Sequence, residues 1–248
     1  MSSIDLNCDM GEGCPHDTEL MHLVSSVSIA GGYHAGDEET MRATVRNAVK
    51  KGVAIGAHPS YLDRDNFGRT STALSFSEII EIVTDQIRKL DRICGEEGSK
   101  LVHVKPHGAL YNQSAKNSEI AAAIAQAVRT YRSDLILFGL SGSLSISEAE
   151  KIGLQTASEA FADRTYRSDG TLTPRSEPNA LITDPEAGAE QAMSIIVDGS
   201  VVATGGKIIE IATDTLCIHG DGEYALEFAN AINRKLTENG IKIEAING

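Results

Sequence analysis

The sequence of 248 residues contains no tryptophan, and aromatic residues make up only 4% of it. Such a chain offers few side chains on which the bases of a nucleic acid could stack. An excess of basic residues is also missing, since 22 Lys and Arg stand against 35 Asp and Glu and the net charge is −13. That charge would repel a phosphate backbone, so nucleic acid is not an expected partner.

Long apolar runs are absent too. No run reaches the roughly 18 residues that a membrane-spanning helix needs, and the N-terminal MSSIDLNCDMGEG has neither the basic region nor the apolar core of a secretory signal. The four cysteines, Cys8, Cys14, Cys94 and Cys217, form no CxxC pair. Dispersed thiols of this kind fit a reducing cytosol, so we expect a cytoplasmic protein with no membrane partner.

Motifs that bind nucleotides are missing as well. The sequence contains neither the phosphate loop GxxxxGKS/T nor the dinucleotide fingerprint GxGxxG. The nucleophile elbow GxSxG of many hydrolases is not found either. A nucleotide site of a standard type is therefore not expected on this chain.

What the sequence does contain is a regular alternation of short apolar and amphipathic segments, with no linker between them. The apolar segments predict strands at Ile4–Cys8, Val27–Ala30, Val53–Ala57, Leu101–Val104, Leu135–Leu140, Thr156–Phe161 and Leu216–His219, with Ile208–Ala212 as a further candidate. The amphipathic segments predict helices at Glu38–Lys51, Ser77–Cys94, Ser118–Tyr131, Ser145–Lys151, Pro185–Val197 and Gly222–Asn239. This alternation predicts one α/β domain over residues 1–248, with a mostly parallel sheet covered by helices.

Polar residues gather at the ends of nearly all these strands. In a β/α barrel, loops from the C-terminal ends of all strands meet at one mouth, whereas an open sheet concentrates its site at one switch point. Four of the seven histidines stand at such ends, namely His34, His58, His107 and His219. We therefore predict a single-domain, distorted (β/α) barrel of about seven strands.

The first three strand ends supply carboxylates and imidazoles for acid–base chemistry. Asp9 and Glu12 follow the first strand and are candidates for a general base, with Asn7 beside them as a substrate contact. The alternative for Asp9 is that it merely caps the next segment. His34 is expected to contact substrate, and His58, directly after the third strand, is a candidate acid or base.

The segment VKPHGALYN follows the fourth strand and holds Lys105, His107 and Tyr111. Lys105 and His107 are two residues apart on an extended segment, so both are expected to point to the same side. A lysine there could bind an anion or stabilise a developing negative charge. The alternative is a buried salt bridge from Lys105 to Asp9 or Glu159. His107 is a candidate acid or base, and Tyr111 a candidate substrate contact.

The last two strand ends add an anion-binding candidate and another histidine. Asp163 and Arg164 follow the sixth strand, and Arg175 belongs to the same set. Arginine recognises carboxylates in a planar, two-pronged geometry, although an ion pair that staples a loop is an equal alternative. His219 ends the seventh strand as a substrate contact, and Asp221 is expected to orient it.

Asp9, His34 and His58 form a candidate set of ligands for a divalent metal ion, because histidine and carboxylate side chains would converge at the barrel mouth. No HExxH motif sharpens this prediction. His103 is different, since it lies inside the fourth strand, and we expect it to be a histidine of the core.

Long motifs spread over the whole chain carry a family resemblance. They are DLNCDMGEG, IAGGYHAGD, GVAIGAHPSYLDRDNFGR, VKPHGALYN, FADRTYRSDGTLTPR and CIHGD, in this order. With them the sequence resembles the LamB/YcsF family, the A subunit of bacterial ATP-dependent 5-oxoprolinase. The second motif departs from the family's usual NIACGFHAGD, because Ser28 and Gly31 stand in place of an asparagine and a cysteine.

The resemblance implies a β/α barrel akin to metal-dependent carbohydrate deacetylases. It also implies hydrolysis of 5-oxo-L-proline, a lactam, to L-glutamate with cleavage of ATP, in a complex with 5-oxoprolinase subunits B and C. ATP would be a co-substrate whose site is shared with the partner subunits or lies on them. In this interpretation Lys105 and Arg164 contact the anion, while Asp9 or Glu12 acts with His58 or His107 as acid and base.

Two other functions stay open at this point. One is a stand-alone metal-dependent hydrolase or deacetylase with Asp9, His34 and His58 as ligands. The other is a subunit that binds a lactam without catalysing its turnover. Bound metal would favour the first, and binding of 5-oxoproline without turnover in the presence of both partners would favour the second.

Overall fold

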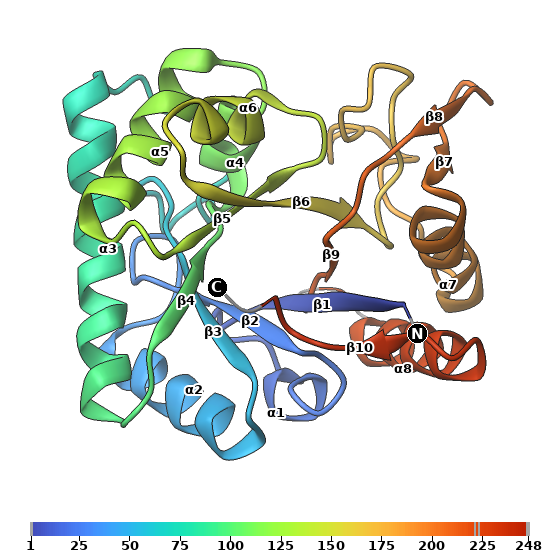
Figure 1. Ribbon diagram of the computed structural model, residues 1–248, viewed down its shortest axis with the longest axis horizontal. Coiled ribbons are helices and arrows are strands. Elements are labelled where there is room, and N and C mark those ends of the chain that lie inside the picture. Colours follow the sequence, from blue (N-terminus) through green and yellow to red (C-terminus); the bar gives the residue numbers. More distant parts are fainter. Residues whose placement is uncertain (1, 221, 223, 247–248) are drawn as a thin grey trace.

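Seven parallel strands close into a barrel with helices around the outside, as Figure 1 shows. The computed structural model describes residues 2–220, 222 and 224–246. The barrel strands are β1 Ser3–Met10, β2 Ser26–Ala30, β3 Ala54–His58, β4 Leu101–Val104, β5 Ile136–Leu140, β6 Gln155–Phe161 and β9 Thr215–Ile218. Because β9 pairs with both β6 and β1, the ring is closed. The predicted barrel and its seven strands are confirmed.

The helices that cover the barrel are α2 Glu38–Lys51, α3 Phe76–Glu96, α5 Ser118–Tyr131, α6 Leu144–Lys151, α7 Pro185–Met193 and α8 Ala225–Glu238. Local signals account for their ends. The Asp37 side chain accepts a hydrogen bond from the backbone N–H of Thr40 and caps α2, which stops at Gly52 in the left-handed conformation. Ser75 and Glu78 form a capping box at the start of α3.

Several short elements escape the sequence prediction. They are α1 Asp17–Leu20, α4 Gly108–Ser114, β7 Ser200–Val202 and β10 Lys242–Ile243. The predicted helix Pro185–Val197 consists of α7 and a π-helical turn, Ser194–Asp198, that continues it. The candidate strand Ile208–Ala212 is β8 Ile208–Glu210, which pairs antiparallel with β7 outside the barrel. Of these elements α4 matters most for the site, because it carries Tyr111 and ends the extended segment after β4 at His107. With only seven residues, α4 is too short to reveal a helical period in the sequence.

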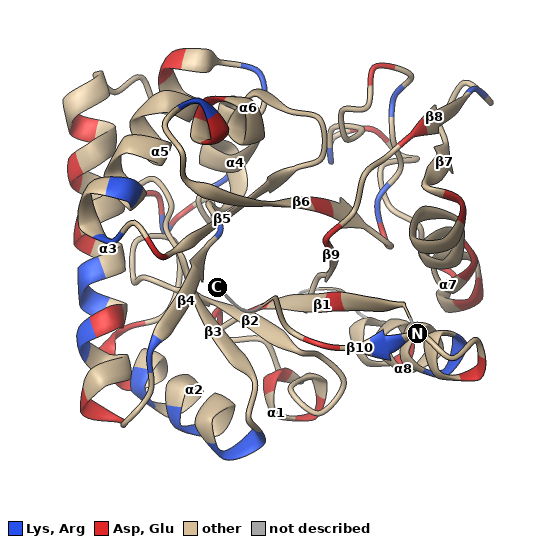
Figure 2. Ribbon diagram, in the orientation of Figure 1, with Lys and Arg blue, Asp and Glu red and all other residues tan. Residues whose placement is uncertain are grey.

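Charged residues lie mainly on the helices and loops, and Figure 2 shows few of them on the barrel strands. On the outer surface Arg42 of α2 pairs with Glu97 at the end of α3, 2.9 Å apart. The few charges on strands include Asp9 and Glu159, and both are buried. Buried charges need partners, so these two carboxylates indicate a polar site inside the barrel in addition to its hydrophobic packing. Within the described ranges, no helix is long and apolar enough to cross a membrane.

Gly56 on β3 makes room for the imidazole of His103 on β4. His103 is 1% exposed, stacks on Phe138 with ring centroids 4.1 Å apart, and lies within hydrogen-bonding distance of Ser28 Oγ at 3.2 Å. This confirms His103 as a core histidine. A methyl group at position 56 would lie 2.0 Å from its Nε2 atom, and the stacked ring has no free space into which to move.

We expect Gly56→Ala to lower the free energy of unfolding by about 1–3 kcal/mol, because overpacking a rigid core forces side chains and backbone to shift. Urea unfolding followed by circular dichroism measures this. Gly95→Ala is the matched control, since an added methyl group on this α3 residue meets nothing within 4 Å and alanine favours helix. A Gly56→Ala variant as stable as the Gly95→Ala variant would contradict the packing argument.

Candidate functional site

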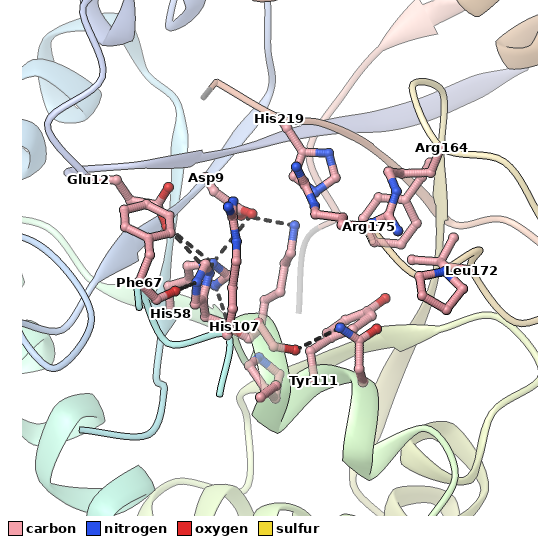
Figure 3. A pocket seen from close by; sticks show the side chains of 18 of the residues that line it. Asp9, Glu12, His58, Phe67, His107, Tyr111, Arg164, Leu172, Arg175 and His219 are labelled. Atoms are coloured by element: carbon pink, nitrogen blue, oxygen red, sulfur yellow. Dashed lines mark hydrogen bonds and ion pairs between the residues drawn. The ribbon is translucent and has the colours of Figure 1, made fainter. Parts of the chain in front are cut away.

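A pocket of about 310 Å³ opens at the C-terminal ends of the barrel strands. Figure 3 shows Glu12, His58 and His107 on one side of it and His219, Arg164 and Arg175 on the other. The predicted site residues that line it are Asp9, Glu12, His58, Lys105, His107, Tyr111, Arg164 and His219. Strand ends far apart in the sequence thus meet at one mouth, as expected of a barrel.

Three residues predicted to contact substrate, Asn7, His34 and Asp163, lie behind this lining. Asn7 is fully buried, and its side-chain amide donates hydrogen bonds to Glu159 Oε1 at 3.0 Å and Thr215 Oγ1 at 2.7 Å. The structure does not place Asn7 among the residues that line the pocket, and its donors are used inside the barrel. His34 and Asp163 hold lining residues in place, as their contacts below show.

Besides Lys105, four basic side chains line the pocket although the protein as a whole is acidic: Arg69, Lys116, Arg164 and Arg175. Two of them were not singled out from the sequence. Arg69 belongs to the FGR of a family motif, which was a usable signal. Lys116 lies between α4 and α5, where no motif marked it. The pocket therefore presents positive charge to a ligand in spite of the net charge of −13.

Lys105 occupies the floor of the pocket and is only 2% exposed. Its Nζ atom lies close to four acceptors: Asn7 Oδ1 at 2.9 Å, Asp9 Oδ1 at 2.9 Å, Glu159 Oε1 at 2.7 Å and Cys217 Sγ at 3.1 Å. An ammonium group has three hydrogens, so all are engaged by the protein. The structure shows the buried salt bridges of Lys105 to Asp9 and Glu159 that were the alternative, and the anion clamp stays a prediction.

The contacts between Lys105 and its acidic neighbours keep both Lys105 and Asp9 in their charged forms. Burial by itself would lower the pKa of Lys105, but the carboxylates of Asp9 and Glu159 outweigh it and raise the pKa well above its usual value. Burial would likewise raise the pKa of Asp9, yet His58 and Lys105 hold it well below the ordinary range. Asp9 therefore stays a carboxylate.

Arg164 lines the pocket, but two of its guanidinium nitrogens are bonded to the protein backbone. Its Nε donates to the carbonyl oxygen of Ala180 at 3.3 Å and its Nη2 to that of Thr173 at 2.7 Å. Burial and the nearby charge of Arg175 lower its pKa. These bonds tie together two parts of the loop after β6, through carbonyl groups and not through the ion pair that was the alternative. Arg175, eleven residues on, is the member of this set that remains a candidate for anion contact.

Glu12, His34, His58 and His107 form a compact cluster on the other wall. Glu12 Oε1 lies 2.9 Å from His34 Nε2, 3.7 Å from His58 Nε2 and 3.4 Å from His107 Nδ1. His58 Nε2 and His107 Nδ1 are 2.9 Å apart. These side chains come from the C-terminal ends of four neighbouring strands, β1 to β4, or from the segments just after them. The cluster is therefore a product of the side-by-side pairing of these strands and not of sequence spacing.

The outward-facing ring nitrogens of two of these histidines have fixed partners. His58 Nδ1 donates to the Lys105 carbonyl oxygen at 2.7 Å, and His107 Nε2 donates to the Phe67 carbonyl oxygen at 2.8 Å. Phe67 has a φ of 55°, a left-handed conformation that costs energy for a residue with a side chain. The carbonyl group of this strained residue is directed at His107. Because the outward nitrogens of both histidines are bonded to carbonyl groups, their inward nitrogens face Glu12.

The imidazoles of the cluster differ in their tendency to take up a proton. Burial and the charge of His58 lower the pKa of His34 to about 3. Burial, His58 and His34 lower the pKa of His107 well below its usual value. For His58 burial acts in the same direction, but Asp9, with Nε2 to Oδ2 at 3.4 Å, outweighs it and raises the pKa. His34 and His107 are consequently neutral near pH 7.

The predicted metal ligands Asp9, His34 and His58 are only partly grouped by the structure. The ligand atoms of Glu12, His34, His58 and His107 lie within 4.8 Å of one another. Asp9 falls in a second group of this kind with Cys217 and His219. The His34 and His58 rings are close, as expected, but Glu12 is the carboxylate between them.

His219 projects into the pocket opposite this cluster and is oriented by Asp163. Its Nδ1 donates to Asp163 Oδ2 at 2.7 Å, and its ring stacks on Phe161. Burial would raise the pKa of Asp163, but His219 outweighs it and lowers the pKa, so the carboxylate is charged. Asp221, predicted for this orienting role, lies outside the described residues. An Asp–His pair of this type leaves Nε2 as a base that faces the pocket.

Tyr111 comes from α4 and lines the pocket near Glu159. Its side chain is buried, and burial together with the charge of Glu159 raises the pKa well above its usual value. The phenol therefore keeps its proton at neutral pH and is a hydrogen-bond donor. Its contact with substrate stays a prediction, and the short helix that carries it was not predicted.

Solved structures of other proteins resemble this chain over nearly its whole length. The lactam utilization protein from Thermus thermophilus is 41% identical, with 98% of this chain and 100% of that chain covered and a TM-score of 0.93. A family 4 carbohydrate esterase from Streptomyces lividans shares 12% identity, 99% and 93% coverage and a TM-score of 0.53. The catalytic domain of a peptidoglycan N-acetylglucosamine deacetylase from Eubacterium rectale shares 10% identity, 99% and 89% coverage and a TM-score of 0.54.

The two carbohydrate-active enzymes show a common fold and no more, because their sequences are far apart from this one. They bear out the predicted likeness to carbohydrate deacetylases at the level of architecture. The model of the LamB/YcsF family matches residues 4–248. With that match over the whole barrel and 41% identity to the lactam utilization protein, the chain belongs to the LamB/YcsF family.

Proposed function

We propose that this chain is the subunit of an ATP-dependent 5-oxoprolinase that hydrolyses 5-oxo-L-proline, a lactam, to L-glutamate. The observation that carries the proposal is the pocket, which sets basic side chains beside the Asp163–His219 pair in a member of the LamB/YcsF family. The name of the Thermus relative, a lactam utilization protein, points to the same substrate class. Subunits B and C are the proposed partners. ATP is the proposed co-substrate, with its site on the partners or shared with them.

The pocket residues suit the chemistry of opening a cyclic amide. His219 Nε2 takes a proton from water, whose oxygen attacks the lactam carbonyl carbon. The carbon–nitrogen bond of the ring then breaks, and the nitrogen leaves with a proton as the amine of glutamate. Asp163 stabilises the imidazolium that forms on His219, and the Tyr111 phenol donates a hydrogen bond to substrate oxygen. ATP cleavage supplies the activation that an unstrained amide lacks.

Arg175 is the proposed contact for the substrate carboxylate. We expect Arg175→Met to raise KM for 5-oxoproline by about 10–100-fold, because a charge-assisted hydrogen bond contributes about 1.5–3 kcal/mol. The value of kcat should fall much less, since the contact is made equally in the ground and transition states. Steady-state kinetics of the assembled complex measure both. Arg167→Met, in the same loop and paired on the surface with Glu177, is the control. An unchanged KM in the Arg175 variant would contradict the assignment.

The proposed function is tested by measuring ATP-dependent release of glutamate from 5-oxoproline. The chain is assayed alone, then with subunits B and C, and finally with B and C lacking it. We expect release only when all three are present. Full release by B and C alone would overturn the proposal. Binding of 5-oxoproline, with release that is unaffected by Asp163→Asn, would instead make the chain a non-catalytic lactam-binding subunit.

A second candidate is a stand-alone metal-dependent hydrolase or deacetylase. The cluster of Glu12, His34, His58 and His107 is the observation in its favour, because such side chains are common zinc ligands. Release of acetate from N-acetylated chitooligosaccharides by the isolated chain, in the presence of Zn²⁺ and without ATP, tests it. Activity there, together with no glutamate release in the three-subunit assay, would replace the first proposal.

A further inference from the structure

We propose that Glu12, His58 and His107 bind one divalent transition-metal ion, of the type of Zn²⁺, at the wall of the pocket. This site differs from the Asp9, His34 and His58 set expected from the sequence. It also goes beyond the proposed lactam hydrolysis, in which no step uses a metal ion. Three observations carry it: the distances between the inward atoms, the partners of the outward nitrogens, and the orientation of the rings.

The inward atoms have the spacing that a metal ion imposes. His58 Nε2, His107 Nδ1 and Glu12 Oε1 are separated by 2.9, 3.4 and 3.7 Å. Zinc bonds to nitrogen and oxygen are about 2.0–2.1 Å long, and a tetrahedron with such bonds has edges of about 3.3 Å. The three observed separations scatter around that edge. All three residues line the pocket, so a fourth position faces the space where a ligand would lie.

The outward nitrogens of both histidines donate to backbone carbonyl oxygens, His58 to Lys105 and His107 to Phe67. This is the arrangement that metal-binding histidines usually have, because the outer hydrogen bond fixes the tautomer and directs the lone pair inward. Gly68 beside Phe67 passes so close to His107 that a methyl group there would lie 2.9 Å from the ring. The backbone segment that supplies the Phe67 carbonyl is thus packed against the ligand that it orients.

Ring orientation separates His34 from the ligand set. The His58 and His107 rings are inclined by 77°, so their planes intersect and one ion can lie in both. The His34 and His107 rings are stacked, with centroids 3.9 Å apart and planes 6° from parallel. An ion in the plane of one of these rings lies above the face of the other, so they cannot share it. His34 instead contacts Glu12 Oε1 from outside at 2.9 Å and orients that carboxylate.

The second group of potential ligands, Asp9, Cys217 and His219, does not suit a metal ion. The ammonium of Lys105 lies 2.9 Å from Asp9 Oδ1 and 3.1 Å from Cys217 Sγ. A second cation beside it would be repelled by its charge. With Co²⁺ bound, thiol and imidazole ligands also give a different absorption spectrum from imidazole and carboxylate ligands, which distinguishes the two groups.

The test is a titration of the EDTA-treated protein with Zn²⁺ and with Co²⁺, followed by calorimetry and by absorption of the Co²⁺ form. We expect one equivalent of either ion and no binding of Mg²⁺, which prefers oxygen ligands. His58→Gln, His107→Gln and Glu12→Gln should each weaken binding by more than about 100-fold. His34→Gln should weaken it by about 10–100-fold, the usual effect of an outer partner. His22→Gln, an exposed histidine, should bind like the parent protein.

Circular dichroism of each variant shows whether it is folded, and a Cys217→Ser variant checks the second group. Parent-like binding by the folded His58→Gln and His107→Gln variants would overturn the proposal, as would a thiolate-to-cobalt band that disappears in Cys217→Ser. Absence of any binding by the parent protein would overturn it as well. The titration uses no lactam or ATP, so its result and that of the glutamate assay are independent.

Discussion

Lys105→Met is expected to lower the free energy of unfolding by about 3–5 kcal/mol, the usual cost of removing one partner from a buried ion pair. Lys105 is the ammonium that contacts both Asp9 and Glu159. Methionine fills a similar volume, so the loss comes from charge and not from a cavity. The two carboxylates would then repel each other in a buried layer, or one of them would have to take up a proton.

Chemical unfolding monitored by circular dichroism measures this loss, and thermal unfolding gives an independent value. Lys116→Met is the matched control, because Lys116 is an exposed lysine at the edge of the same pocket. We expect the control to stay within about 0.5 kcal/mol of the parent protein. A Lys105 variant as stable as the Lys116 variant would show that Asp9 and Glu159 do not need Lys105 as their counter-charge.

Asp163→Asn is expected to reduce kcat/KM for lactam hydrolysis by about 10²–10⁴-fold, the range in which a general base contributes. The reason is geometric, since Asp163 accepts the Nδ1 proton of His219 and so keeps Nε2 free toward the pocket. An amide at position 163 can present its N–H group instead and reverse the tautomer. This prediction rests on the proposed function and uses the complex with subunits B and C.

Kinetics distinguish this effect from a general loss of structure. We expect Asp163→Asn to lower kcat more than it raises KM and to leave the circular dichroism spectrum unchanged. His219→Gln should be equally impaired, and the double variant should be little worse than either single one, because the pair acts as a unit. Glu177→Gln, which alters an exposed ion pair in the same loop, should remain active. Near-parental activity of the Asp163 variant would contradict the proposed role of His219 as the general base.

The architecture was predictable because its signals are local. Apolar segments such as LILFGL are buried on both faces, and that pattern alone indicates a strand of a parallel sheet. The alternation of such strands with helices restricts the topology. Polar residues at successive strand ends then indicated a common mouth, where the structure brings together Asp9, His58, His107 and His219.

The roles of individual site residues were harder to predict. Lys105 resembled an anion clamp, but its four acceptors come from three other strands. Arg164 resembled a substrate contact, yet it binds carbonyl groups of its own loop. Asp221, the expected partner of His219, lies outside the described residues, and the partner that the structure shows is Asp163, 56 residues away in sequence. For Lys105 and Arg164 the sequence indicated the chemistry of the side chain, and the structure showed its direction.

By itself, the sequence determined the strands, most helices, the barrel, the family and the set of residues from which a site is built. It could do so because hydrophobic period, caps and motif order act over a few neighbouring residues. The tertiary structure alone decided which of these residues face a ligand and which face one another. That choice depends on which strands pair in space, since β9 lies between β6 and β1 and the β6–β9 pairing places Asp163 beside His219. Hydrogen bonds act over about 3 Å in space, and no spacing along the chain encodes that distance.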